Sequence, residues 1–195
     1  MSANASGVLI YKIKVKVSNV VIPETVDGYP VVEVFALYYY NHRDFSSAVK
    51  SIDLPDTVEI IGEQAIAETN LTSIVLPRNL RKIGPDSFKY CRNLKTVVWN
   101  DRLEYIGFEA FQESEITEIT LPESLKRIAY GAFRNCRNLT SVKMPSHYVD
   151  FQGIDIEFHG YNGTSNGAFS GCHNLSPALK EAINAAGYCG SFEAV

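Results

Sequence analysis

The sequence predicts an α/β repeat solenoid, a stack of short coils around one elongated core, and three observations lead to this prediction. Short apolar segments that end in proline recur along the chain: SIDLP (51–55), SIVLP (73–77), EITLP (118–122) and SVKMP (141–145), with TVVWN (96–100) in the same slot. Their closing residues follow one another at steps of 22, 23, 22 and 23. Each unit is too short to bury its own apolar face, so neighbouring units must stack to form a continuous core.

The bulk composition is that of a single globular domain, which we assign to residues 1–195. The 22 Asp and Glu outnumber the 18 Lys and Arg, so we expect no nucleic-acid partner. No run of about 18 apolar residues is present, so we expect no membrane-spanning helix. Lysines interrupt the apolar N-terminal segment, which is therefore unlike a signal peptide: either the native chain stays inside the cell or a leader has been removed.

Each unit divides into three parts, which the second unit illustrates. Ile74 and Leu76 alternate with polar or exposed positions, which predicts a short strand with one buried face, and the proline that follows ends the strand. The segment LRKIG (80–84) forms a second side, and its glycine suits a tight corner. The stretch PDSFKYC (85–91) predicts one helical turn whose phenylalanine points inward.

The combined pattern L-x-x-I-x-L-P-x-x-L-x-x-I-G-x-x-A-F-x-x-C-x-x-L resembles the BspA-like (Treponema pallidum-type) leucine-rich repeats of bacterial surface proteins over roughly residues 20–175. Ile66 and Ala129 depart from the family pattern, which has Phe and Gly there. The resemblance implies a right-handed leucine-rich repeat solenoid with a parallel concave β-sheet. It also implies a secreted or cell-surface location and a protein ligand on a host or neighbouring cell, neither of which the sequence itself signals.

Both ends of a solenoid need caps, because an open terminal strand is a template for aggregation. We expect residues 1–50 to hold an N-terminal β cap and a first divergent repeat. In this cap apolar positions alternate with mostly lysine positions; the apolar positions are Leu9, Tyr11, Ile13, Val15 and Val17. We expect the aromatic stretch 35–45 to pack against the same cap, and an aromatic carbohydrate-binding platform is the alternative for it. The regular repeats span 51–145, and residues 146–175 form a last repeat with an insertion.

Residues 176–195 are expected to form a helical cap over the last repeat. Ser176 is a suitable N-cap, Pro177 suits the first helical position and Gly187 suits the position after the helix. Leu179, Ile183 and Ala186 share the face that would cover the core.

Three cysteines occupy one repeat slot, which suggests packing more than chemistry. The slot holds Cys91, Cys136 and Cys172, and Thr69 or Ser114 fills it elsewhere, so it suits a small buried side chain. Stacked strands lie about 4.8 Å apart, which puts Cys91 and Cys136 about 10 Å apart, too far for a disulfide. Pairing of Cys172 with Cys136 or Cys189 stays open. No cysteine or histidine spacing typical of a metal site is present, and we expect no cofactor.

The outward residues of the predicted strands form the candidate binding face. They are small, mostly polar and mildly apolar at the centre: Ser73, Val75, Thr96, Val98, Glu118, Thr120, Ser141 and Lys143, with Ser51 and Asp53 beside them. A shallow surface of this kind suits a protein or peptide better than a small molecule. The leading hypothesis is a monomeric, non-enzymatic protein-interaction or adhesion module. An unoccupied strand face in a purely structural domain is the alternative.

The insertion at 146–167 is a second candidate, because loops on a rigid scaffold often carry function. Asp155, Glu157 and His159 alternate there and would share one face of a strand. They could hold a divalent cation or act as an acid/base pair in a cation-dependent carbohydrate binder or hydrolase. A half-buried strand with a solvated polar face is the simpler explanation of these three residues, and the one we favour.

Two columns of residues are expected to support the stacking register. The first, Glu59, Arg81, Glu104 and Lys126, alternates in charge along the stack. In the second, Tyr105 lies between Lys82 and Arg127, where a cation–π contact is expected.

Overall fold

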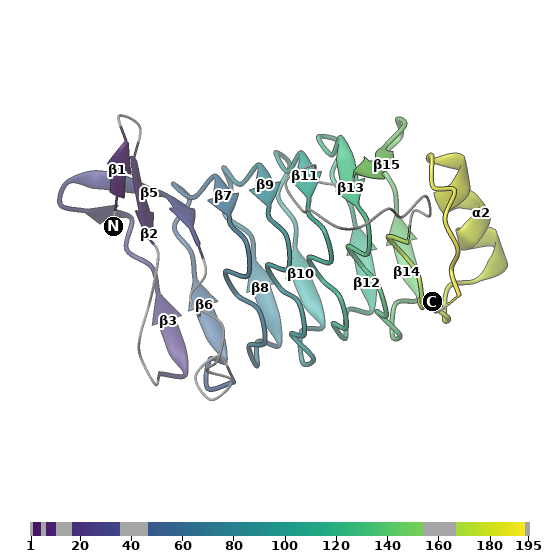
Figure 1. Ribbon diagram of the computed structural model, residues 1–195, viewed down its shortest axis with the longest axis horizontal. Helices are drawn as coiled ribbons and strands as arrows, with labels where there is room; N and C mark the ends of the chain where they lie inside the picture. Colours follow the sequence, from purple (N-terminus) through teal and green to yellow (C-terminus); the bar gives the residue numbers. More distant parts are fainter. Residues whose placement is uncertain (1, 5–6, 11–16, 36–46, 154–166, 194–195) are drawn as a thin grey trace.

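The computed structural model describes residues 2–4, 7–10, 17–35, 47–153 and 167–193. These residues form the predicted leucine-rich repeat solenoid, whose coils stack along the long axis of the molecule (Figure 1). Each regular coil has three sides, which are a strand of the concave sheet, a strand of a second sheet and a turn.

The strands of the concave sheet lie where the repeat pattern predicts them. They are β3 (Asn19–Val21), β6 (Ser51–Asp53), β8 (Ser73–Val75), β10 (Thr96–Val98), β12 (Glu118–Thr120) and β14 (Ser141–Lys143). The middle residue of each strand faces the core and its two neighbours face solvent, as the period of two requires. The strands pair in parallel as β3 with β6, β8 with β10, and β12 with β14.

The second side of each coil is a strand, although the sequence predicted only a corner there. The strands are β1 (Ser2–Asn4), β2 (Gly7–Ile10), β4 (Thr25–Val26), β5 (Tyr29–Val34), β7 (Ile60–Ile61), β9 (Lys82–Ile83), β11 (Tyr105–Ile106), β13 (Arg127–Ala129) and β15 (Asp150–Gly153). From β2 to β15 they pair in parallel as one unbroken sheet, and β4 pairs with β5 as an antiparallel hairpin.

The glycines at the end of these strands let the backbones of adjacent coils lie close together. A Cβ atom added at Gly107 would lie 2.5 Å from the carbonyl carbon of Gly84, and one added at Gly84 would lie 2.9 Å from that of Gly62. None of the three has a positive φ. The recurring glycine is therefore needed because a side chain would collide with the backbone of the preceding coil. This role differs from the tight corner that the sequence suggested.

The N-terminal end carries the predicted β cap, with the described strands placed nearer the N-terminus than expected. β1 and β2 form an antiparallel hairpin, and β2 pairs in parallel with β5. Residues 11–16, on which most of the predicted alternating strand falls, and residues 36–46 of the aromatic stretch lie outside the described part of the chain.

The third side differs from the helical turn that PDSFKYC suggested. Asp86 and Tyr90 have φ of 54° and 59°, so a left-handed residue lies at each end of the turn and breaks the helical hydrogen-bond pattern. Instead, alternate N–H groups point along the stack. Those of Asp86, Phe88 and Tyr90 donate to the carbonyls of Phe108, Ala110 and Gln112 at 2.7–2.9 Å. The turns therefore form a third ladder between coils.

A stack of phenylalanines runs through the core, one from each of four successive turns. The ring centroids of Phe88 and Phe111 lie 4.9 Å apart, those of Phe111 and Phe133 5.4 Å, and those of Phe133 and Phe169 also 5.4 Å. All four rings are fully buried, and Trp99 meets the Phe111 ring edge-on at 5.6 Å. Close-packed rings of this kind are the largest apolar contribution that each coil brings to the core.

The C-terminal cap is the predicted helix, α2 (Pro177–Ala185), which closes the end of the stack (Figure 1). Ser176 Oγ accepts the Leu179 N–H at 3.2 Å, and Gly187 has a φ of 113°. Ile183 is buried, and Tyr188, which the repeat pattern does not mark, is buried beside it, where its ring meets Phe169 edge-on at 5.5 Å.

The predicted charge columns are largely present. Glu104 pairs with Arg81 at 3.1 Å and with Lys126 at 2.6 Å. Lys82 Nζ lies 5.4 Å from the centre of the Tyr105 ring, whereas Arg127 forms an ion pair with Asp150 at 2.8 Å. These exposed contacts support the register and contribute little to stability.

Candidate functional site

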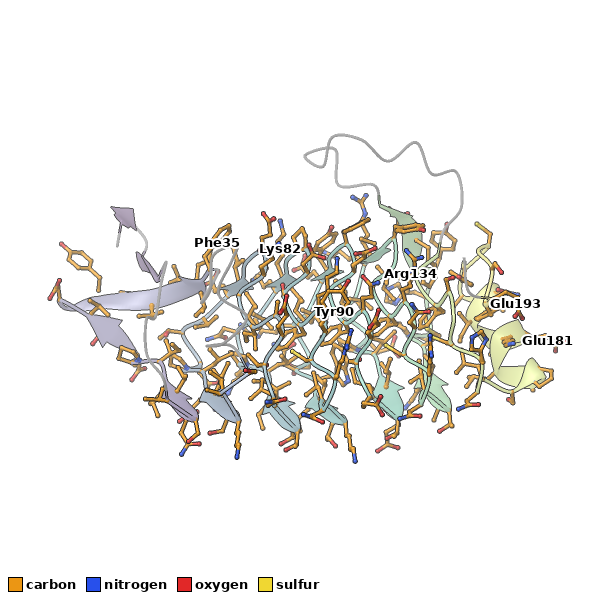
Figure 2. All side chains as sticks on the ribbon, turned by 60° about the horizontal axis from the view of Figure 1, so that its bottom comes forward. Phe35, Lys82, Tyr90, Arg134, Glu181 and Glu193 are labelled. Carbon is orange, nitrogen blue, oxygen red and sulfur yellow. The ribbon has the colours of Figure 1, made fainter. Side chains whose placement is uncertain are left out.

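The structure brings the predicted face residues together on one exposed surface. Ser73 lies in register with Thr96 and Val75 with Val98, while on the next strand pair Glu118 lies opposite Ser141 and Thr120 opposite Lys143. All eight are exposed. Figure 2 shows the side chains of these strands projecting on the side of the solenoid away from the labelled Lys82.

Two adjacent valines form the apolar centre of this face. Val75 is 67% exposed and Val98 50% exposed, and they occupy matching positions of neighbouring parallel strands. Partners in adjacent parallel strands lie about 5 Å apart, so the two side chains form one continuous apolar patch. Adjacent apolar side chains that stay largely exposed are candidates for contact with a partner.

Hydroxyl groups and single charges surround the valine pair. Ser73 and Thr96 lie on one side along the strands, and Thr120 lies beyond Val98 in the direction of the C-terminus. Glu118 and Lys143 place opposite charges at that end, and Asp53 places a negative charge toward the N-terminus. The face therefore offers hydrogen-bonding groups and both signs of charge around an apolar centre, as protein-binding surfaces do.

The structure extends this face by one strand that the sequence-based prediction did not include. Asn19 and Val21 of β3 face outward, Val21 is 71% exposed, and Ser51 Oγ donates to Asn19 Oδ1 at 2.8 Å. The signal for this strand is the segment VVIP (20–23), which repeats the strand-proline pattern. Its outward residues could have been added to the face on that basis.

The alternative site in the insertion lies outside the described residues. This applies to Asp155, Glu157 and His159, and their roles stay a prediction. Across the residues that the structure does describe, no group of three His, Cys, Asp or Glu side chains is close enough to hold a metal ion. Within the same residues no helix is long and apolar enough to cross a membrane.

The repeated cysteines are buried thiols that bond to the preceding coil. Cys91 Sγ donates to the Ile66 carbonyl at 3.2 Å, Cys136 Sγ to that of Phe111 at 3.3 Å, and Cys172 Sγ to that of Phe133 at 3.1 Å. Burial raises the pKa of the Cys91 thiol to about 11 and that of Cys136 to about 12. A thiol that stays protonated is a poor nucleophile, so these groups are structural. Cys189 is an exposed thiol.

A cluster of charged side chains on the turns is the main polar feature that the sequence did not lead us to predict. Lys89 Nζ lies 3.1 Å from Asp86 Oδ1 and also bonds Glu109, which is 3.6 Å from Arg134 Nη1. Asp86 Oδ1 accepts no well-oriented hydrogen bond from the described residues. Burial raises the pKa of Asp86, and the Lys89 charge opposes this shift.

The signal for this cluster is positional. Asp86 and Glu109 fill one slot of successive repeats, and Lys89 and Arg134 each follow that slot by three residues. Each carboxylate lies beside a cation of its own or a neighbouring turn, so the cluster links adjacent coils.

Comparison with known proteins agrees with this architecture. A family model for the BspA type leucine rich repeat region matches residues 41–176 in six copies. The crystal structure of a leucine-rich repeat protein from T. pallidum is similar, with 29% identity and a TM-score of 0.73 over 97% of this chain and 92% of that one. A leucine-rich repeat protein from Bacteroides ovatus has 26% identity and a TM-score of 0.65, over 90% of this chain and 43% of that one. No curated protein matches the chain.

Proposed function

The chain belongs to the BspA-type leucine-rich repeat family, and from this premise we propose that it is a non-enzymatic binding module whose concave face holds a protein or peptide ligand. The observation that carries the proposal is the pair Val75 and Val98. These two aliphatic side chains are exposed in register on two strands joined by a parallel ladder.

The energetics of the face favour a macromolecular ligand. Covering the two valines removes apolar surface from water, at about 25 cal/mol for each Å² buried. The hydroxyls of Ser73 and Thr96 and the charges of Glu118 and Lys143 then supply hydrogen bonds and orientation at the rim. Because β8 and β10, which carry the valine pair, are joined by a parallel ladder over a packed core, little ordering entropy is lost at the apolar centre when a ligand binds.

The location that we propose is extracellular or at the cell surface, with a ligand on a host or neighbouring cell. Its support is the family to which the chain belongs. We propose further that the protein is a monomer whose binding energy comes from the concave face.

The experiment that tests the proposal compares two charge-matched double variants. Val75→Glu with Val98→Glu places two carboxylates in the centre of the face. Ala178→Glu with Ala185→Glu adds the same charge to exposed positions of α2. Proteins from host-cell surface extracts that the wild-type chain retains should be lost by the first variant and kept by the second.

Circular dichroism and urea unfolding establish that both variants fold like the wild type. Retention of the same proteins by a folded Val75→Glu, Val98→Glu variant would show that they bind elsewhere.

A further inference from the structure

Neighbouring strands of the concave sheet form a hydrogen-bonded ladder at some coil interfaces and none at others. Whether they do follows the length of the loop that precedes the second strand. Strands separated by 23 residues are paired, as β8 with β10 and β12 with β14. Strands separated by 22 residues, β6 with β8 and β10 with β12, share no ladder in the described structure. The longer step contains the loop CRNL before the second strand, and the shorter step contains TNL or SEI.

Backbone hydrogen bonds beside the strands show the same alternation. At the paired interfaces Leu76 N donates to Val98 O and Leu121 N to Lys143 O, each at 3.0 Å. Trp99 has the equivalent place between β10 and β12, and its N–H donates to no carbonyl of the next coil in the described chain.

The residues that precede the strands give a second comparison of this kind. Lys95 N donates to Thr72 O and Thr140 N to Thr117 O, each at 2.9 Å. Thr117 has the equivalent place at the β10–β12 interface, where its N–H likewise makes no bond to the neighbouring coil among the described residues.

Side chains in the loop slot provide an independent observation. Thr69 Oγ1 lies 3.2 Å from Cys91 Sγ, and Ser114 Oγ lies 3.2 Å from Cys136 Sγ. Each of these contacts joins a short-loop coil to the long-loop coil that follows, which is where the strands are paired. Strand pairing and these side-chain contacts therefore join β8 to β10 and β12 to β14, and neither is present between β10 and β12 among the described residues.

The other two sides of the solenoid are not interrupted in this way. At the coil interface between β10 and β12, the second sheet continues from β11 to β13. The turn ladder also continues, from Asp86 N to Phe108 O, and the rings of Phe88 and Phe111 stay stacked. Hydrogen bonds thus join the two coils in the second sheet and in the turns, but no strand ladder joins them on the concave side.

We propose that the interface between β10 and β12 is a hinge built into the fold, about which the concave face opens while the second sheet keeps its ladder. The shortened loop at Ser114–Ile116 is its cause, because the strand that follows starts one residue earlier than in a CRNL coil. The β6–β8 interface has the same loop length, but there Asn70 N donates to Val49 O at 2.9 Å just before the two strands, so the hinge is assigned to β10–β12 alone. Trp99, whose ring meets Phe111 and Phe133, lies at the hinge and reports on it. The proposal concerns the free protein and does not depend on the ligand.

Residue-resolved hydrogen exchange of the free wild-type protein tests the hinge. The protection factor of Trp99 N–H should be at least about tenfold below those of Leu76 and Leu121, and that of Thr117 should fall equally far below those of Lys95 and Thr140. Each comparison sets a hinge amide against amides in the same repeat position. Equal protection factors for the hinge amide and its two counterparts, in both comparisons, would contradict the proposed hinge.

A loop variant tests the proposed cause. Replacing the segment Ser114–Ile116 by Cys-Arg-Asn-Leu gives this coil the longer loop. In the folded variant, the protection factors of the Trp99 and Thr117 amides should rise to those of the amides in the same repeat positions. The control variant Trp99→Leu keeps the short loop, so its Thr117 amide should still exchange rapidly. If the lengthened loop changes neither amide in a cooperatively folded protein, loop length does not set the hinge.

Discussion

Truncation of Phe111 to alanine should be among the most damaging single changes in the core. The ring is fully buried between Phe88 and Phe133, at 4.9 and 5.4 Å, with Trp99 edge-on at 5.6 Å. Removing a buried phenylalanine costs about 3–5 kcal/mol, and each aromatic pair adds about 0.5–1.5 kcal/mol beyond the buried area. Because the alanine variant has none of these three aromatic pairs and the rigid ladders prevent collapse of the cavity, we expect stability to fall by about 5 kcal/mol.

Urea unfolding followed by far-UV circular dichroism measures this fall in stability, since Trp99 fluorescence would respond to the missing ring directly. Phe111→Ile is the matched control, because Ile66 fills the same slot in an earlier repeat. Isoleucine keeps most of the apolar volume but has no ring to stack, so we expect roughly half the cost. A cost of less than about 1 kcal/mol for Phe111→Ala with an unchanged m-value would refute the view that the ring stack carries the core.

Three further predictions concern other parts of the molecule. At pH 8 iodoacetamide should alkylate only Cys189 in the native protein, because burial raises the pKa of the other thiols; mass spectrometry showing a second native label would contradict this. Gly107→Ala should lower the free energy of unfolding by about 1–3 kcal/mol, because its Cβ meets the Gly84 backbone, and a neutral result in the same urea assay would mean that the coils separate freely. Burial raises the pKa of Asp86 above its usual 3.8, so the folded state binds this proton more tightly than the unfolded state does, and the group's contribution to the free energy of unfolding rises as the pH falls through the folded pKa toward 3.8. The Asp86→Asn variant has no such group, so its free energy of unfolding should rise less than that of the wild type between pH 7 and pH 4. An equal change for both proteins in urea unfolding would be evidence against this role.

The concave strands and the C-terminal cap were predictable because each has a strong local signal. Ile74 and its equivalents alternate with exposed residues at a fixed period, and Ser176, Pro177 and Gly187 mark the helix ends. The second sheet lacks such a signal. A strand of two residues such as Lys82–Ile83 has no alternation to detect, and its pairing depends on stacking with the next coil.

The turn geometry and the hinge are also set by tertiary contacts. Aspartate is one of the residues that more often adopt a left-handed backbone, but tyrosine is not, and Tyr90 adopts one where its N–H joins the ladder between turns. The one-residue difference between CRNL and SEI is visible in the sequence, but its effect on strand pairing appears only when neighbouring coils are compared. The insertion residues that were predicted as an alternative site lie outside the described chain and stay a prediction.

Site-specific photo-crosslinking tests the central proposal, ligand binding on the concave face, most directly. A benzophenone amino acid is introduced by Val98→p-benzoylphenylalanine and, as the control, by Ala178→p-benzoylphenylalanine on the exposed face of α2. On irradiation with a protein that the wild-type chain retains, position 98 should give a covalent adduct and position 178 should not. An adduct from position 178 with none from position 98, in two variants that both keep the partner bound, would contradict the proposal.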